Sequence, residues 1–374
     1  MRIAIYYNLA FGGAKRVVFE HAKGLKKRNQ VDVYTVNPQR DIFDPSIYAN
    51  TAYAYTFQHD NYKLPIVSRF IRDYKKFFSL KIFNKKIAKD IDKRGYDVVL
   101  VHPDRLTQAP FLLQFVKTPT VYYCQEPLRI VYEYALRLKD KVGLLKHLYE
   151  ETIRIYLKRI DRENVRSAKY TIATCCHIRE RMIEAYDVYP KIVYCGVDDA
   201  VFRPMRIKKL HQVFYVGSPN SPVDGYDLVE RAINFIPKQL RPRLQVVSWK
   251  KENGARLKEE ELSVIYNQSI ATLCTSKFET FGLVPLESMA CGTPVIATKV
   301  SGHRETIVDG KTGYLVDFNP KEIAEKLIFI IKNPSIATSM GENARKHIEN
   351  VFTWEKQIAI LEKTLVELVK KHKE

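Results

Sequence analysis

The chain of 374 residues is too long for one ordinary domain, and its 46% hydrophobic and 28% charged residues exclude a disordered chain. No apolar run approaches the roughly 18 residues that span a bilayer, and the first residues lack a secretory signal, so we expect a cytoplasmic protein. The net charge is +19, of which residues 1–200 hold +13. A field of this sign attracts nucleic acid, anionic lipid or phosphorylated ligands, and charge alone does not choose among them.

The first half of the chain alternates short apolar strands with helical patterns. Gly12–Gly13 separates the first strand from a helical face, and strands are predicted at 3–7, 31–36, 97–101 and 121–124. Such alternation predicts a parallel sheet with helices on both faces.

Residues 65–94 form a long, basic and amphipathic helical pattern, in which aromatic and aliphatic residues recur at helical spacing among lysines and arginines. One interpretation is a helix that packs this stripe on the sheet and leaves its lysines in water, and the other is direct membrane contact. Both can hold, because long lysine side chains reach lipid headgroups from a packed helix. A second basic helical region is predicted at about 131–166.

A second series of strands and helices begins near residue 192. Helices are predicted at 226–236 and 353–372, and strands at 192–195, 213–216, 244–248, 271–274, 294–297 and 314–316. We therefore predict an α/β fold of two Rossmann-like, doubly wound domains, residues 1–195 and 196–352, that face each other across a cleft. Ligands of such sheets bind beyond the carboxyl ends of the strands.

The most informative segment is 276–316. It places Glu279 in a loop, Gly282 before a predicted helix, and Glu287 inside that helix. The backbone N–H groups of Phe281, Gly282 and Leu283 lack helical partners, so they form an anion site that the helix dipole supports. A carboxylate on each side suits a nucleotide sugar, although capping and surface pairing would explain two acids on their own.

This segment resembles the retaining, GT-B-fold glycosyltransferases of family four, the glycosyl transferases group 1. The similarity continues at the Gly12–Gly13 loop, at the segment 196–204, and at Trp354 with the last helix, part of which would pack back on the N-terminal domain. Within the segment, the matching residues are Glu279, Phe281, Gly282, Glu287, Met289, Ala290, Gly292, Pro294, Val295, Ile296, Ala297, Ser301, Gly302, Glu305, Gly310, Thr312, Gly313 and Leu315.

The resemblance implies a nucleotide-sugar donor held mainly by the C-terminal domain. An acceptor hydroxyl on the N-terminal domain would attack the anomeric carbon with retention of configuration. Glu279 would face the donor sugar, Glu287 would bind ribose hydroxyls, and Gly12 and Gly13 would let the backbone approach the phosphates. Neither a metal nor another cofactor is implied, because protein cations and helix amides offset the pyrophosphate charge.

Two positions depart from the family pattern on the donor side. Ser218 stands where members usually carry an arginine, and Asp224 stands where they carry a lysine. Lys250, with Lys251 beside it, and Arg16 after the glycine loop are candidates to replace these cations. The alternative for each is a solvated surface charge.

The acceptor side also departs from the family. Many members place a histidine where this chain has Gln125, which cannot act as a base. The following Glu126 could act as a base or orient the acceptor, or a phosphate oxygen of the leaving group takes the proton. His102 is a further candidate on this side or a structural hydrogen-bonding residue, and Arg129 binds an acceptor phosphate or pairs with Glu133.

The leading hypothesis is therefore transfer of a hexose from GDP-mannose or a UDP-hexose to a lipid-linked or polysaccharide acceptor, in cell envelope polysaccharide synthesis. The basic N-terminal half predicts a protein peripheral on the inner, anionic face of a membrane. The alternative is a glycosyltransferase-like protein that binds nucleotide or carbohydrate without turnover, as a subunit of a glycosylation complex. No nucleic-acid motif accompanies the charge, so nucleic acid is not expected as a partner.

Overall fold

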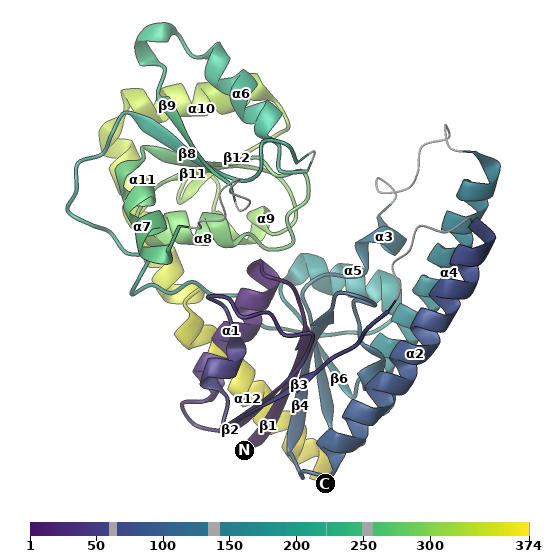
Figure 1. Ribbon diagram of the computed structural model, residues 1–374. Coiled ribbons are helices and arrows are strands. Elements are labelled where there is room, and N and C mark those ends of the chain that lie inside the picture. The colour runs from purple at the N-terminus through teal and green to yellow at the C-terminus, as the bar shows by residue number, and fades with distance from the viewer. Residues whose placement is uncertain (60–65, 134–142, 222, 249–256, 374) are drawn as a thin grey trace. The chain divides into compact units, whose positions relative to one another are not determined.

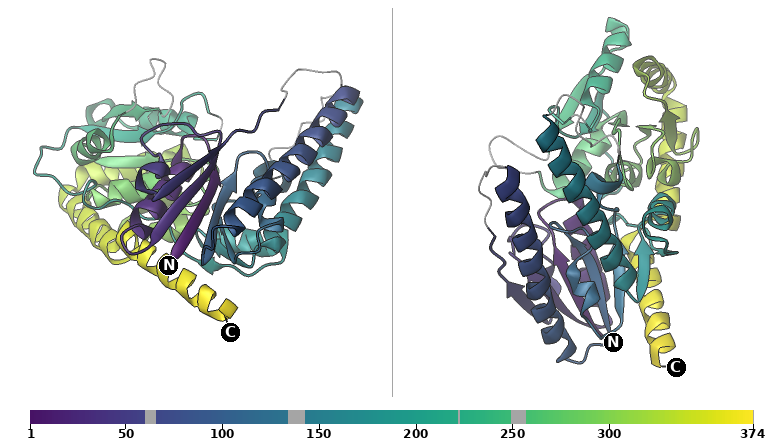
Figure 2. Two further views of the ribbon diagram at one scale, coloured as in Figure 1. Left: turned by 60° about the horizontal axis from the view of Figure 1, so that its bottom comes forward. Right: turned by 90° about the vertical axis from the view of Figure 1, so that its right-hand side faces the viewer.

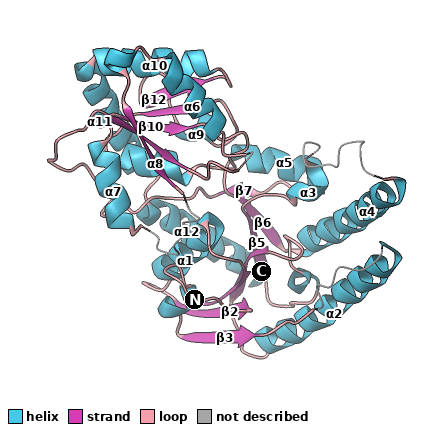
Figure 3. Ribbon diagram, turned by 45° about the horizontal axis from the view of Figure 1, so that its top comes forward, coloured by secondary structure: helices cyan, strands magenta, loops and turns pink. Residues whose placement is uncertain are grey.

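The computed structural model describes residues 1–59, 66–133, 143–221, 223–248 and 257–373. The chain forms an N-terminal unit of Met1–Val193 with Ile358–Glu374, and a C-terminal unit of Tyr194–Gln357. Each unit holds one parallel sheet between helices (Figure 3). The predicted α/β fold of two Rossmann-like domains is confirmed.

The N-terminal sheet has seven parallel strands in the order β3-β2-β1-β4-β5-β6-β7. The inner strand β1 is buried from Ile3 to Tyr7, and its Ile5 lies opposite Val33 of β2 and Leu100 of β4. Strands β3 and β6 were not predicted from the sequence. The strands are β1 (Arg2–Asn8), β2 (Gln30–Val36), β3 (Thr51–Tyr55), β4 (Val98–Asp104), β5 (Thr120–Cys124), β6 (Tyr170–Ala173) and β7 (Lys191–Ile192).

Helices cover both faces of this sheet, as right-handed crossovers between parallel strands require. One face carries α1, η1 and the last helix, whose Ile358 packs on Gly24 of α1, and the other carries α2, η2, α4 and α5 (Figure 1). Within the described residues, no helix combines the length and apolar character of a membrane span. The helices are α1 (Gly13–Leu25), η1 (Pro45–Tyr48), α2 (Ile66–Asp92), η2 (Phe111–Gln114), α3 (Arg129–Tyr132), α4 (Leu144–Ser167), α5 (Cys176–Tyr186) and α12 (Trp354–Lys373).

The C-terminal unit is a smaller sheet of five parallel strands, in the order β12-β11-β10-β8-β9. Its core joins Val213 and Tyr215 of β8 to Leu273 of β10, with α6 and α10 on one face. Helices α8 and α11 pack together on the other face. The elements are β8 (Gln212–Val216), α6 (Tyr226–Phe235), η4 (Lys238–Leu240), β9 (Arg243–Val247), α7 (Glu259–Gln268), β10 (Ala271–Cys274), α8 (Leu283–Ala290), β11 (Val295–Thr298), α9 (His303–Thr306), β12 (Gly313–Val316), α10 (Pro320–Lys332) and α11 (Pro334–Val351).

The strand predicted at 192–195 is wrong beyond Ile192. Val193 still donates its N–H to the carbonyl of Ala173, at 3.1 Å, but the N–H of Tyr194 binds the side-chain oxygen of Gln357 at 3.0 Å. The chain therefore leaves the sheet here, because the hydrogen-bond partner changes from a neighbouring strand to the first turn of α12.

Candidate functional site

The predicted anion site lies at the start of α8, beyond the carboxyl end of β10. The helix begins at Leu283, as the sequence predicts, and Gly282 is its N-cap residue with φ +97°, a conformation that glycine adopts without strain. No side chain of the described residues caps this helix. Its first N–H groups and its dipole therefore suit a phosphate, as at other uncapped helix N-termini.

Glu287 is almost wholly buried, with 1% of its surface exposed. Its Oε2 accepts a hydrogen bond from the Tyr266 hydroxyl at 2.8 Å. Burial and the nearby Glu287 carboxylate raise the pKa of Tyr266 well above its ordinary value, so the phenol stays a donor. The sequence carried no signal for this partner on α7, 21 residues before Glu287. Ribose binding by Glu287 remains a prediction.

Glu279 lies in the loop before α8 and is half-buried. Its backbone carbonyl accepts a hydrogen bond from the N–H of Gly302 at 3.2 Å, and its carboxylate helps to raise the pKa of the buried Cys274 thiol, after burial itself. The loop is thus fixed through its backbone. The side chain of Glu279 remains the predicted contact to a donor sugar.

His303, the first residue of α9, lies against the turn that starts α8. A Cβ atom on Gly282 would stand 3.2 Å from His303 Cδ2, and His303 Nδ1 donates to the carbonyl of Thr298 at 3.0 Å. Burial lowers the pKa of His303 to about 4, although the hydrogen bond to Thr298 raises it. A neutral imidazole therefore packs against the turn that forms the predicted phosphate site. In the sequence, the only signal for this packing role of His303 was its position directly after Gly302 of the family pattern.

This burial predicts a pH dependence of stability. Below about pH 6.5 the unfolded chain binds a proton at His303, whereas the folded chain does so only near pH 4. The contribution is therefore fully present above pH 6.5, and about 3 kcal/mol is lost as the pH falls toward 4. Urea unfolding of the natural chain and of His303→Asn, which keeps a donor for Thr298, should diverge over this range. If the unfolding free energies of the two chains change in parallel with pH, the burial of a neutral His303 is contradicted.

The loop after β8 is ordered by Asp224, which the sequence placed at the position of a phosphate-binding lysine. Its carboxylate accepts hydrogen bonds from the Ser218 N–H at 2.8 Å and from the Ser221 hydroxyl at 2.9 Å, and its carbonyl accepts one from the Tyr215 hydroxyl. The Asp224 carboxylate thus holds the loop in place by hydrogen bonds, at a position where the family carries a cation. Ser218 remains a candidate donor contact because it follows the carboxyl end of β8. Lys250 and Lys251 lie outside the described residues.

In the N-terminal unit the glycine loop starts α1. Gly12 is the N-cap residue with φ +155°, and a Cβ atom there would meet nothing within 4 Å, so the backbone angle is what requires glycine. Gln125, at the end of β5, donates from Nε2 to the carbonyl of Ala14 at 3.0 Å. The structure therefore brings Gly12, Gly13 and Gln125 together, and Gln125 holds the loop.

Arg16, which the sequence predicts to contact the donor, is largely buried within the N-terminal unit. It is 5% exposed, and its guanidinium lies over the Phe43 ring, 5.5 Å from the centroid. The preceding Lys15 is fully buried and pairs with Asp41 at 2.8 Å. The first turn of α1 thus packs into the N-terminal unit, because the segment after β2 folds over it.

Glu126 and Arg129 follow Gln125 on the way into α3. Burial raises the pKa of Glu126, while Arg129 lowers it and Glu133 raises it. A carboxyl group with a raised pKa at a strand end suits proton transfer. Arg129 pairs with Glu133 at 3.2 Å, which is the second of the two predicted alternatives.

The assignment of His102 to the acceptor side is wrong. Strand β4 extends to Asp104, beyond the predicted strand, so His102 lies inside the strand and is fully buried. Its Nε2 is 3.3 Å from Nδ1 of His21, and burial lowers the pKa of both imidazoles. The two rings form a neutral pair between α1 and the sheet.

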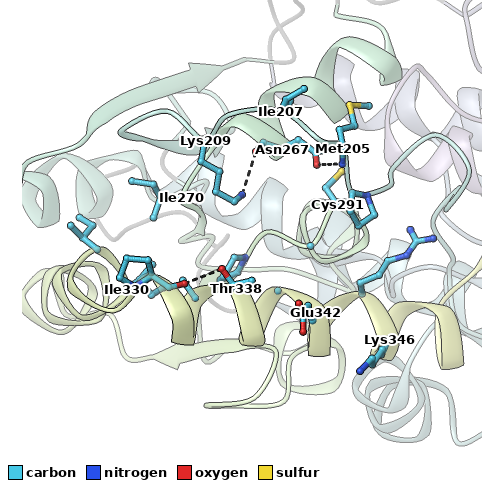
Figure 4. A pocket seen from close by; sticks show the side chains of 18 of the residues that line it. Met205, Ile207, Lys209, Asn267, Ile270, Cys291, Ile330, Thr338, Glu342 and Lys346 are labelled. Atoms are coloured by element: carbon cyan, nitrogen blue, oxygen red, sulfur yellow. Dashed lines mark hydrogen bonds between the residues drawn. The ribbon is translucent and has the colours of Figure 1, made fainter.

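A pocket of about 580 Å³ in the C-terminal unit lies at the opposite edge of its sheet, because His211, Ile270 and Pro294 precede β8, β10 and β11 (Figure 4). Lys209 lines it and donates to the carbonyl of Ser269 at 2.8 Å, and burial lowers the pKa of Lys209 to about 8. Among the described residues, no predicted donor residue lines this pocket. It is therefore distinct from the site at α8.

The two parallel-sheet units and the site at α8 define the GT-B class of glycosyltransferases. Residues 254–347 match Glycosyl transferases group 1, and residues 11–201 match Glycosyltransferase Family 4. The chain belongs to Glycosyltransferase Family 4.

Two relatives illustrate the range of the similarity. An uncharacterized glycosyltransferase of Methanocaldococcus jannaschii is 31% identical over 142 residues, which is 38% of each chain. The alpha-1,3/1,6-mannosyltransferase ALG2 of Dictyostelium discoideum is 37% identical over 98 residues, 26% of this chain and 23% of the relative. The chain thus matches well under half the length of these curated relatives.

Solved structures show the same fold over the whole chain. Sucrose-phosphate synthase from Thermosynechococcus elongatus has a TM-score of 0.70 at 20% identity, covering 99% of this chain and 100% of that one. HepE of Anabaena in complex with UDP-glucose has a TM-score of 0.69 at 17% identity, covering 97% and 100%. At these identities the likeness concerns the fold.

Proposed function

We propose that this chain is a retaining glycosyltransferase that moves a hexose from a nucleotide sugar to a lipid-linked or polysaccharide acceptor. The observation that carries the proposal is the uncapped N-terminus of α8, flanked by Glu279 and Glu287 at the carboxyl edge of the C-terminal sheet. Membership of Glycosyltransferase Family 4 supports the class of reaction.

In the proposed reaction, the acceptor oxygen forms a bond to the anomeric carbon while the bond from that carbon to the phosphate oxygen breaks. The nucleoside diphosphate leaves with the electron pair. The N–H groups at Phe281, Gly282 and Leu283 stabilise its charge, and Glu279 orients the sugar. The acceptor proton passes to Glu126 or to a phosphate oxygen. No metal or other cofactor takes part.

The donor is proposed to be GDP-mannose or a UDP-hexose. One relative is named a mannosyltransferase, and one structure of the same fold was solved with UDP-glucose. We further propose that the protein works in cell envelope polysaccharide synthesis, in the cytoplasm and on the inner face of a membrane, which the net charge of +19 supports.

A thermal-shift panel tests the donor site. The full chain would be heated with UDP, GDP, ADP or TDP, and with the matching nucleotide sugars. A ligand at 100 times its Kd adds about 2.7 kcal/mol of stability, so one nucleotide should raise the Tm clearly above the others. Radiolabelled donor of that base, with a lipid extract as acceptor, then tests transfer. No shift with any nucleotide would contradict the proposed function.

A second candidate is binding without turnover, as a subunit of a glycosylation complex. The loop at Ser218 and Asp224 favours it, because a carboxylate that orders the loop stands where the family has phosphate-binding cations. A nucleotide-dependent rise in Tm without transfer or donor hydrolysis would support this candidate. Turnover by the isolated chain would exclude it.

A further inference from the structure

Helix α2 carries an apolar stripe on its solvent side. Ile71, Tyr74, Phe78 and Ile82 are each 55–62% exposed and recur at spacings of three or four residues, so they share one face. The opposite face is buried, as at Phe77 and Leu80. Large apolar side chains gathered in this way mark an interaction surface more often than scattered ones do.

Helix α4 carries a matching stripe. Leu144, Leu148 and Ile155 are 60–82% exposed and also share one face of their helix. Neither stripe is needed to hold the two helices together, since other residues of α2 and α4 make that contact.

The two stripes lie on the same side of the sheet. The ring of Phe70 lies 4.8 Å from that of Tyr149, and the ring of Phe77 lies 5.7 Å from that of Tyr156. These ring pairs join the inner sides of the two helices, away from the stripes, and Figure 2 shows α2 and α4 side by side over one face of the sheet. The exposed stripes therefore join into one surface, the α2–α4 face.

Basic residues continue both stripes toward the ends of the helices. On α2 they are Lys85, Lys86 and Lys89, all exposed. On α4, a hollow of about 480 Å³ is lined by Ile155, Lys158, Arg159, Arg162, Glu163 and Arg166. Glu163 pairs with Arg159 at 2.8 Å, which leaves the hollow strongly cationic. The α2–α4 face is thus apolar over its first half and basic over its second.

The helices are longer than the sheet that they cover. Helix α2 has 27 residues and α4 has 24, whereas β4 has seven. At 1.5 Å per helical residue, α2 is about 40 Å long, against about 23 Å for β4. The N-terminal ends of both helices project beyond the carboxyl edge of the sheet, which is the edge where Gln125 and Glu126 lie (Figure 1).

We propose that the α2–α4 face docks the protein on an anionic membrane. The apolar stripes would enter the boundary between headgroups and acyl chains, and the basic residues would bind lipid phosphates. A second copy of the chain fits this face poorly, because its own basic residues would meet one another. The proposal deepens the proposed function and rests on it for its purpose, since the membrane would then present a lipid-linked acceptor at the acceptor edge.

Sedimentation with vesicles tests the docking surface in the absence of donor and acceptor. The full chain should sediment with vesicles of phosphatidylglycerol and phosphatidylcholine in equal parts, and not with phosphatidylcholine alone. Binding should weaken at high salt, which screens charge. Phe78→Ser with Ile155→Ser, and separately Lys86→Glu with Lys89→Glu, should each lower vesicle affinity by more than about tenfold.

Matched controls change exposed residues of the same kinds in the C-terminal unit. They are Phe235→Ser with Ile336→Ser, and Arg231→Glu with Lys332→Glu, and they should leave vesicle affinity within about twofold. If the controls lose as much vesicle affinity as the α2 and α4 variants, binding is a diffuse charge attraction and the proposal is overturned. It is also overturned if the natural chain binds no vesicles, or if the α2 and α4 variants alter a self-association instead.

The same experiment separates this proposal from the proposed function. Vesicle binding that depends on the α2–α4 face, in a chain without transfer activity, sustains the docking surface and contradicts the enzyme. Transfer to a soluble acceptor by a chain that does not bind anionic vesicles sustains the enzyme and contradicts the docking surface. Nucleotide-induced thermal shifts should be the same in all the variants, which shows that each is folded.

Discussion

Gly302→Ala is expected to destabilise the C-terminal unit by about 3 kcal/mol. The backbone of Gly302 is helical, with φ −63°, so alanine is conformationally allowed there. A Cβ atom would, however, lie 2.3 Å from the Cα and the carbonyl oxygen of Phe281. These are backbone atoms, so the loop before α8 must move. Urea unfolding should show the loss, and the thermal shift with nucleotide should shrink as well.

Gly143→Ala is a suitable control. Gly143 precedes α4 with φ −53°, and a Cβ atom there meets nothing within 4 Å. We expect its unfolding free energy to change by less than about 1 kcal/mol. Stability of Gly302→Ala equal to that of the natural chain would show that Gly302 does not fix the loop.

Glu279→Gln is expected to lower kcat about hundredfold while nucleotide affinity stays unchanged. The half-buried side chain lies in a loop that its backbone fixes, so stability should change by less than about 1 kcal/mol. Initial rates over a range of donor concentrations separate kcat from KM. Unchanged turnover in this variant would remove Glu279 from the site.

Glu287, inside α8, provides the contrast to Glu279 in the loop before it. Glu287→Ala should weaken nucleotide binding and also cost about 2 kcal/mol of stability, because the buried Tyr266 hydroxyl loses its acceptor. Glu287→Gln keeps an acceptor oxygen and should restore most of the stability but not the nucleotide affinity. A variant of Glu287 with natural affinity for nucleotide would contradict the ribose role.

Taken alone, the sequence determined the elements and the kind of fold. Helix 283–290 was predicted with its bounds, since Gly282 and Pro285 mark its start and small residues its end. The buried strands were recognisable because parallel strands covered on both faces are continuously apolar. β3 and β6 were missed, since Thr51–Tyr55 is largely exposed and the first two residues of Tyr170–Ala173 are only half-buried, so neither is a continuously apolar run.

The sequence identified the motif residues but not the contacts that explain them. Gly302 belonged to the family pattern, and the structure shows that its missing Cβ admits the backbone of Phe281. Asp224 was recognisable only as an absent lysine, whereas in the structure its carboxylate orders the loop after β8.

Only the tertiary structure decided which polar side chains are accessible. His102 and Arg16 looked available at a strand end and after a glycine loop, yet both are buried, by α1 and by the segment around Phe43. Gln125 was predicted beside an acceptor, and it binds the carbonyl of Ala14, 111 residues away. Periodicity and capping act over a few residues, so the sequence shows them directly. Burial depends on which distant segment covers a side chain, and that is set by the packing of the whole unit.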